Sequence, residues 1–187
     1  MGGKRKLPVD TMALPLPERK AIWKERDARS YMEGKWVTDA DGAYFVTSEG
    51  SDIAFDQRDY SLVVTLCERY LREFPYIKNR NIEHAMVRRW LGESFIALGK
   101  AEAGTVELRL TLKAYDTKPN LKPIVGATIV FRSLLFAAFQ RDAEDKVEPC
   151  VLDLAAEVSV KGRPPGLPPL NFDSVENYGQ LRDLLSR

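Results

Sequence analysis

Residues 81–116 read NIEHAMVRRWLGESFIALGKAEAGTVELRLTLKAYD. Apolar side chains recur in this stretch at spacings of three and four residues, which is typical of amphipathic α-helices. Asn81 is suited to cap the start of a helix. Gly99 is suited to end one, because glycine readily adopts the left-handed conformation that follows a helix. We therefore predict one helix over 81–97 and a second over 101–115.

Helical patterns continue on both sides of this pair. Residues 56–74 carry one apolar stripe, which ends where Pro75 prevents the helix from continuing. Residues 121–140 are apolar around most of a helical circumference, which predicts a central helix covered on several sides. Shorter patterns predict further helices over 17–34 and 149–158.

Small and large side chains alternate in a defined order within residues 85–116. A Leu-Gly pair, an aromatic residue, two further glycines and two leucines occur in turn: Leu91, Gly92, Phe95, Gly99, Gly104, Leu108 and Leu112. This order resembles the tetratricopeptide repeat, a unit of two antiparallel helices in which small residues let the helices approach and large ones fill the groove. Two positions depart from the family pattern, because Thr111 stands where alanine is usual and the closing proline, Pro119, comes late.

Residues 59–75 resemble the second helix and closing proline of another such repeat, and an insertion over 76–82 separates the two. The resemblance implies TPR-like antiparallel helical hairpins and a protein-binding surface lined by the first helix of each hairpin, rather than catalysis. A lone repeat cannot bury its apolar faces. We therefore expect flanking helices at 17–34 and 121–140 to cap its two ends.

Composition divides the chain into four parts, and the fold class we predict is all-α in the main. The parts are an extended basic arm over 1–16, a helical domain over 17–160 with its TPR-like core at 59–119, a proline-rich strap over 161–172, and a C-terminal amphipathic helix over 173–187. Asp173 is the expected cap of the last helix.

One segment inside the helical domain has a sequence pattern that is not typical of a helix. Over residues 35–55, turn-forming residues flank the short run Ala43-Tyr-Phe-Val-Thr47. Turn, short extended run and turn together predict either a small β-hairpin or a long ordered loop.

Overall composition is that of an ordinary globular protein. Lys and Arg (28) nearly balance Asp and Glu (27), giving a net charge of +1, so no global field drives the chain onto nucleic acid or lipid. Two distant cysteines, Cys67 and Cys150, predict free thiols in a reducing compartment: the cytoplasm by default, or a mitochondrion. The most apolar run, 124–139, contains Arg132 and is shorter than the roughly 20 residues of a membrane span.

Residues for catalysis or metal binding are sparse. His84 is the single histidine, and no Cys, His or Asp stands at ligand spacing from it, so we expect no metal site and no cofactor. Sequence motifs for a nucleophile elbow or a phosphate cradle are absent. An enzyme would have to draw on scattered carboxylates, namely Glu68, Glu73, Glu93 and Glu102. We therefore expect a protein that is not an enzyme.

The leading hypothesis is a soluble, non-catalytic adaptor or structural subunit of a larger multiprotein assembly, because long proline-containing arms gain order chiefly on a partner surface. The candidate partner-binding residues are Lys4, Arg5, Lys6, Arg80, Arg88, Arg89, Glu93, Arg163, Pro165 and Pro168. The last three belong to a Pro-x-x-Pro stretch with a flanking arginine. The alternatives are a nucleic-acid-associated protein using basic segments 4–6 and 78–89, and a divergent enzyme.

Overall fold

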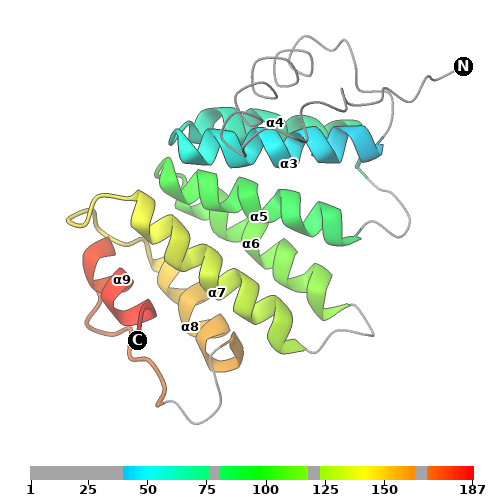
Figure 1. The fold of residues 1–187 in the computed structure, drawn as a ribbon. Coiled ribbons are helices and arrows are strands. Elements are labelled where there is room, and N and C mark those ends of the chain that lie inside the picture. Colours follow the sequence, from blue (N-terminus) through cyan, green and yellow to red (C-terminus); the bar gives the residue numbers. More distant parts are fainter. Residues whose placement is uncertain (1–39, 76–80, 118–122, 163–167) are drawn as a thin grey trace, which may run out of the picture.

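The computed structural model describes residues 40–75, 81–117, 123–162 and 168–187. These ranges form seven helices and contain no strand (Figure 1). The helices are α3 (Ala40–Asp56), α4 (Tyr60–Glu73), α5 (Asn81–Ala97), α6 (Ala101–Asp116), α7 (Pro123–Gln140), α8 (Pro149–Gly162) and α9 (Tyr178–Leu185). The mainly helical fold predicted from the sequence is therefore confirmed. The predicted arm over 1–16 and helix over 17–34 lie outside the described residues.

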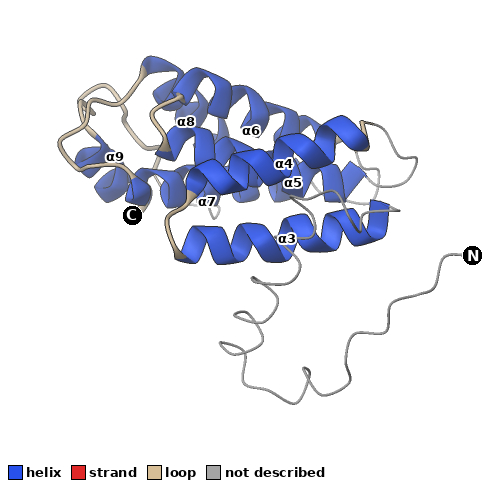
Figure 2. Ribbon diagram, turned by 90° about the horizontal axis from the view of Figure 1, so that it is seen from above, coloured by secondary structure: helices blue, strands red, loops and turns tan. Residues whose placement is uncertain are grey.

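Each helix from α3 to α8 packs against the next one along the chain, and the pairs α3 with α4, α5 with α6 and α7 with α8 lie one beyond the next (Figure 1). Contacts between the pairs join α5 to α3, α4 and α7, and also join α6 to α7 and α8. Seen from above, the axes of the long helices are roughly parallel to one another (Figure 2). Helices α3, α5 and α7 thus follow one another along one side of the stack.

The prediction of a β-hairpin or loop over 35–55 is wrong for the part that the structure describes, because residues 40–56 form α3. Gly50 is one of the residues expected to form a turn, but it lies within α3 and packs against α4. A Cβ at this position would lie 2.8 Å from Cδ1 of Leu66 in α4. Thr47 is buried and donates a hydrogen bond to the carbonyl of Ala43 at 2.8 Å. Close packing on α4 at Gly50 and the Thr47 hydrogen bond within α3 thus accommodate these residues in a helix.

Helices α5 and α6 approach each other closely where two glycines face each other. A Cβ on Gly92 would lie 2.9 Å from the carbonyl oxygen of Gly104, and one on Gly104 would lie 2.7 Å from that of Gly92. Thr111, which departs from the repeat pattern, is fully buried, and its hydroxyl donates to the carbonyls of Ala85 at 3.1 Å and Glu107 at 3.0 Å. The hydroxyl therefore has partners despite its burial.

Two clusters of buried apolar side chains form the core. The first joins α3, α4 and α5 through Ala43, Val46, Ala54, Val63, Leu66, Cys67, Tyr70, Val87, Trp90 and Leu91. The second joins α5 through α9 and includes Ile96, Leu108, Val130, Leu134, Leu154, Tyr178 and Leu181. Helix α5 contributes to both clusters, so it connects the two halves of the described fold.

The C-terminal helix begins five residues later than predicted. Asn177, not Asp173, caps α9, because its side chain accepts a hydrogen bond from the amide of Gln180 at 2.9 Å. Before this cap the backbone pairs with the link that precedes α8: the amide of Val147 donates to the carbonyl of Glu176 at 3.0 Å. This pairing is incompatible with a helix that starts at residue 173.

Helix α9 packs against its own chain at the end of α7. Tyr178 is fully buried, and its hydroxyl donates to Glu148 at 2.7 Å. Nε of Arg182 donates to the carbonyl of Ala138 at 2.6 Å. Residues 161–162 of the predicted strap belong to α8, and 168–172 have no regular secondary structure. None of the described helices is long and apolar enough to cross a lipid bilayer.

Candidate functional site

Two adjacent arginines of α5 have different surroundings. Nη1 of Arg88 donates to Oε2 of Glu107 at 2.6 Å, which joins α5 to α6. Arg89 lies one turn from Glu93, and its Nε is 3.3 Å from Oε1 of that residue. The geometry of this second ion pair is not that of a hydrogen bond, although Nε of Arg89 is buried. Arg88 is therefore a structural residue, and Arg89 is the stronger candidate for binding.

Arg89 lies against aromatic side chains from two helices. Its guanidinium carbon is 5.9 Å from the centre of the Trp90 ring, and Tyr44 of α3 stacks on Trp90 with ring centres 6.2 Å apart. Burial raises the pKa of Tyr44, the carboxylate of Glu83 raises it further, and the charge of Arg89 opposes both. The Arg89 side chain is 28% exposed, so it lies at the edge of the core and is open to solvent.

Glu93 is the only charged side chain that is classed as buried in the described ranges. Loss of hydration raises the pKa of its carboxyl to about 7, while the Arg89 charge and the Ser133 hydroxyl of α7 act in the opposite direction. Glu93 therefore lies where α5 meets α7, with one charged neighbour in its own helix and one polar neighbour in α7. We call Tyr44, Arg89, Trp90, Glu93 and Ser133 the Arg89 cluster.

The same side of α7 also contacts the first helical pair. Ser133, Phe136 and Gln140 are three and four residues apart and so share one side of the helix. Phe136 meets Phe55 of α3 edge to face, with ring centres 5.3 Å apart. Oε1 of Gln140 accepts a hydrogen bond from the Tyr60 hydroxyl at 2.6 Å. The end of α7 thus reaches across to α3 and to the start of α4.

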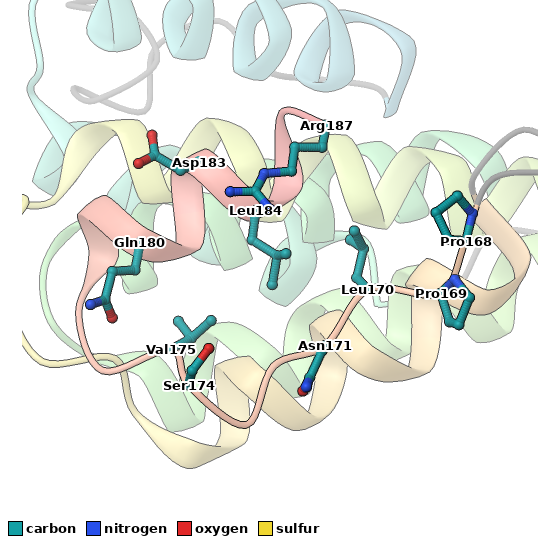
Figure 3. A pocket seen from close by; sticks show the side chains of 10 residues that line it. All are labelled: Pro168, Pro169, Leu170, Asn171, Ser174, Val175, Gln180, Asp183, Leu184 and Arg187. Carbon is teal, nitrogen blue, oxygen red and sulfur yellow. The ribbon is translucent and has the colours of Figure 1, made fainter.

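The other predicted binding residues are not brought together with this cluster. Lys4, Arg5, Lys6, Arg80, Arg163 and Pro165 lie outside the described residues. Pro168 is exposed and lines a second feature, a hollow of about 710 Å³ between the chain over 168–175 and α9 (Figure 3). Leu170 and Leu184 point toward one another in this hollow, and Asp183 and Arg187 also line it. Both polar and apolar side chains line this hollow, and together they indicate no particular ligand or reaction.

The histidine and cysteine side chains, which are the types most often used in catalysis or metal binding, form no catalytic or metal-binding group in the described residues. The ring of His84 packs against Tyr70 at 5.4 Å, and its Nε2 lies 2.6 Å from the carbonyl of Phe74. Burial raises the pKa of the Cys67 thiol, and Cys67 and Cys150 are both free. No group of three or more His, Cys, Asp or Glu side chains in the described part of the chain is placed to hold a metal ion.

The four carboxylates named for an enzyme are in three different environments. Glu68 and Glu102 are exposed, Glu73 accepts a hydrogen bond from Arg69 at 2.7 Å, and Glu93 is buried against Arg89. One catalytic centre would need at least two of them to converge. The surroundings of these four carboxylates therefore give no evidence for a reaction that they would carry out together.

Sequence reasoning named Arg89 and Glu93 but missed Tyr44 and Ser133. Tyr44 was missed because its segment was not expected to be helical. Ser133 was missed because a lone serine in an apolar helix gives no signal of its own. A buried hydroxyl needs a polar partner, so an apolar helix that contains one serine is a weak sign that a polar group faces it.

Comparisons of the chain with protein-family models, curated protein sequences and solved structures found no match.

Proposed function

We propose that the protein is a non-catalytic adaptor or structural subunit that binds a partner protein along the side of the stack formed by α3, α5 and α7. The carrying observation is Arg89. Its side chain is 28% exposed and lies against Trp90, and its Nε is buried, yet the guanidinium makes no hydrogen bond with any described residue. An arginine can donate five hydrogen bonds, and a partner that supplied acceptors would satisfy groups that the free protein leaves unused.

Arginine and aromatic side chains at the edge of a packed core also suit the centre of a protein–protein interface. Tryptophan, tyrosine and arginine are enriched among the few residues that contribute most of the affinity in measured interfaces. Tyr44 is partly exposed beside Arg89, and Phe136 is 37% exposed further along the same side. These observations support an elongated contact that runs across helices from three successive pairs.

The TPR-like interpretation remains part of this proposal. Three stacked helical pairs, with two glycines facing each other between α5 and α6, support it, and in such arrays partners lie along the first helices of the pairs. Under this interpretation α3, α5 and α7 are the first helices. The nucleic-acid alternative is weakened, because Arg88 is already paired with Glu107.

Affinity capture of the tagged protein from its native source, with mass spectrometry at low and high salt, tests the proposal. We expect stoichiometric protein partners that survive high salt and are lost from Arg89→Gln. The matched control is Arg109→Gln, which removes an equal charge from an exposed ion pair with Glu157 on the opposite side of the stack. This control should retain the partners, and circular dichroism should show both variants folded.

Two outcomes would contradict the proposal. If the protein is recovered alone, or with nucleic acid that salt removes, it is not a stable assembly subunit. If Arg89→Gln retains every partner that the native chain captures, binding occurs elsewhere and the α3–α5–α7 side is not the interface.

A further inference from the structure

The contact between α5 and α7 has an unusual composition. Apolar side chains dominate the core around it, yet Glu93 is placed in this contact with 6% of its side chain exposed. Burying a carboxylate costs free energy unless it is well paired and hydrogen-bonded. The pairing here is incomplete, because Nε of Arg89 lies 3.3 Å from Oε1 without hydrogen-bond geometry.

We propose that protonation of Glu93 controls how firmly α7 packs on α5, so that the α3–α5–α7 side is a proton-sensitive joint. In the neutral form, the carboxyl carries no charge that burial would deprive of hydration, and the contact closes. In the charged form, Arg89 and the Ser133 hydroxyl do not offset the lost hydration of the carboxylate, and the contact loosens as Glu93 moves toward water. This inference concerns the regulation of the surface in the proposed function, and its biological meaning rests on that proposal.

Several groups on the surrounding helices face the pair. On α5 itself the charged neighbour is Arg89, and on α7 the polar neighbour is Ser133. From α4 the Cys67 thiol is influenced by Glu93, and Tyr44 of α3 and Tyr115 of α6 are both influenced by Arg89. Arg89 is thus the only cation among the groups that interact with Glu93, and no second cation compensates the buried charge within the described residues.

Loosening at Glu93 would extend to the first helical pair. Ser133 shares one side of α7 with Phe136 and Gln140, which contact Phe55 and Tyr60. A shift of α7 away from α5 therefore also weakens the contacts that join α7 to α3 and α4. The relevant pH range is close to neutral, because burial raises the pKa of Glu93 to about 7.

Amide hydrogen exchange of the free full-length chain, followed by mass spectrometry from pH 5.5 to 8.5 and corrected for the intrinsic exchange rate, tests this inference. We expect the protection of residues 123–140 to fall as pH rises, by at most about tenfold per pH unit below the pKa of Glu93. Glu93→Gln, which mimics the neutral carboxyl, should keep its low-pH protection throughout. Glu107→Gln makes the same chemical change in the other α5 ion pair and should follow the native chain.

Flat protection in the native chain, or an equal fall in Glu93→Gln, overturns the inference. Should Glu93→Gln fail to fold, the ¹³C NMR titration of the Glu93 carboxyl in the native chain decides instead. A midpoint near neutrality supports the joint, and one near the ordinary value of 4.5 contradicts it. Because no partner is present, a negative result here leaves partner binding intact, and failed capture leaves the joint intact.

Discussion

The hydroxyl of Tyr60 donates a 2.6 Å hydrogen bond to Oε1 of Gln140, a residue 80 positions later in the chain. With the Phe55–Phe136 ring contact, this bond joins the first helical pair to the third. The stack therefore has a direct connection between its outer pairs besides the one through α5.

This bond should appear as an energetic coupling. Tyr60→Phe and Gln140→Ala each remove one partner, and a double-mutant cycle in urea should give a coupling of about 1 kcal/mol. Thr65→Ala removes only a local hydrogen bond to Ser61 and should be additive with either change. Additivity of Tyr60→Phe with Gln140→Ala would mean that the bond is not formed in solution.

Gly104 should be less tolerant of alanine than an ordinary helical glycine. A Cβ there would lie 2.7 Å from the carbonyl oxygen of Gly92, and a backbone atom cannot rotate away. The clash should outweigh the gain in helix propensity, so Gly104→Ala should lose about 1–2 kcal/mol in chemical denaturation. The neighbouring Ala103 is exposed, and Ala103→Gly should also destabilise, by about 1 kcal/mol. Equal or higher stability of Gly104→Ala would contradict the close helix approach.

The two possible caps of the last helix can be separated by substitution. Asn177→Ala should cost about 1 kcal/mol, because it removes the acceptor of the Gln180 amide. Asp173→Ala should change the free energy of unfolding little, since Asp173 is exposed and lies outside α9. A larger loss of stability in Asp173→Ala than in Asn177→Ala would instead support a helix that starts at residue 173, as the sequence predicts.

The helices that the sequence predicted well are those whose apolar residues repeat clearly. Residues 81–97, 101–115 and 56–74 correspond closely to α5, α6 and α4. Helix α3 was missed because its buried side includes Thr47, Gly50 and Ser51, which resemble turn residues when the packing partner is unknown. Their burial depends on α4, and local propensity carries no information about that contact.

The candidate site was predictable only in part, for a similar reason. Arg89 and Glu93 are one helical turn apart, so their pairing follows from sequence spacing. Tyr44 and Ser133 join them from helices more than 35 residues away in either direction, and that meeting exists only in the assembled stack. Arg88 and Arg89 are equivalent by sequence alone. Their roles differ because Glu107 lies beside Arg88 and pairs with it.

The two cysteines should differ in reactivity. Cys67 is fully buried and its pKa is raised by burial, whereas Cys150 is partly exposed in the first turn of α8. A disulfide-exchange reagent such as DTNB at pH 8 should therefore label one thiol quickly in the native protein and two in denaturant. Cys150→Ser should abolish the fast phase. Two fast thiols in the native protein would show that α4 is more accessible than its packing implies.

Global stability should fall as pH rises from about 5 to 7. The folded-state pKa of Glu93 is raised from 4.5 to about 7, so between these values the folded protein binds more protons than the unfolded chain. Its contribution is therefore fully present below pH 4.5 and is lost as pH rises through 7, by at most about 3 kcal/mol. Urea denaturation at several pH values should show this slope in the native chain. Glu93→Gln should lack this contribution and become the more stable protein above pH 7, because its amide does not ionise. A native chain whose stability rises over this interval while Glu93→Gln behaves identically would mean that the Glu93 carboxyl is hydrated and paired in solution.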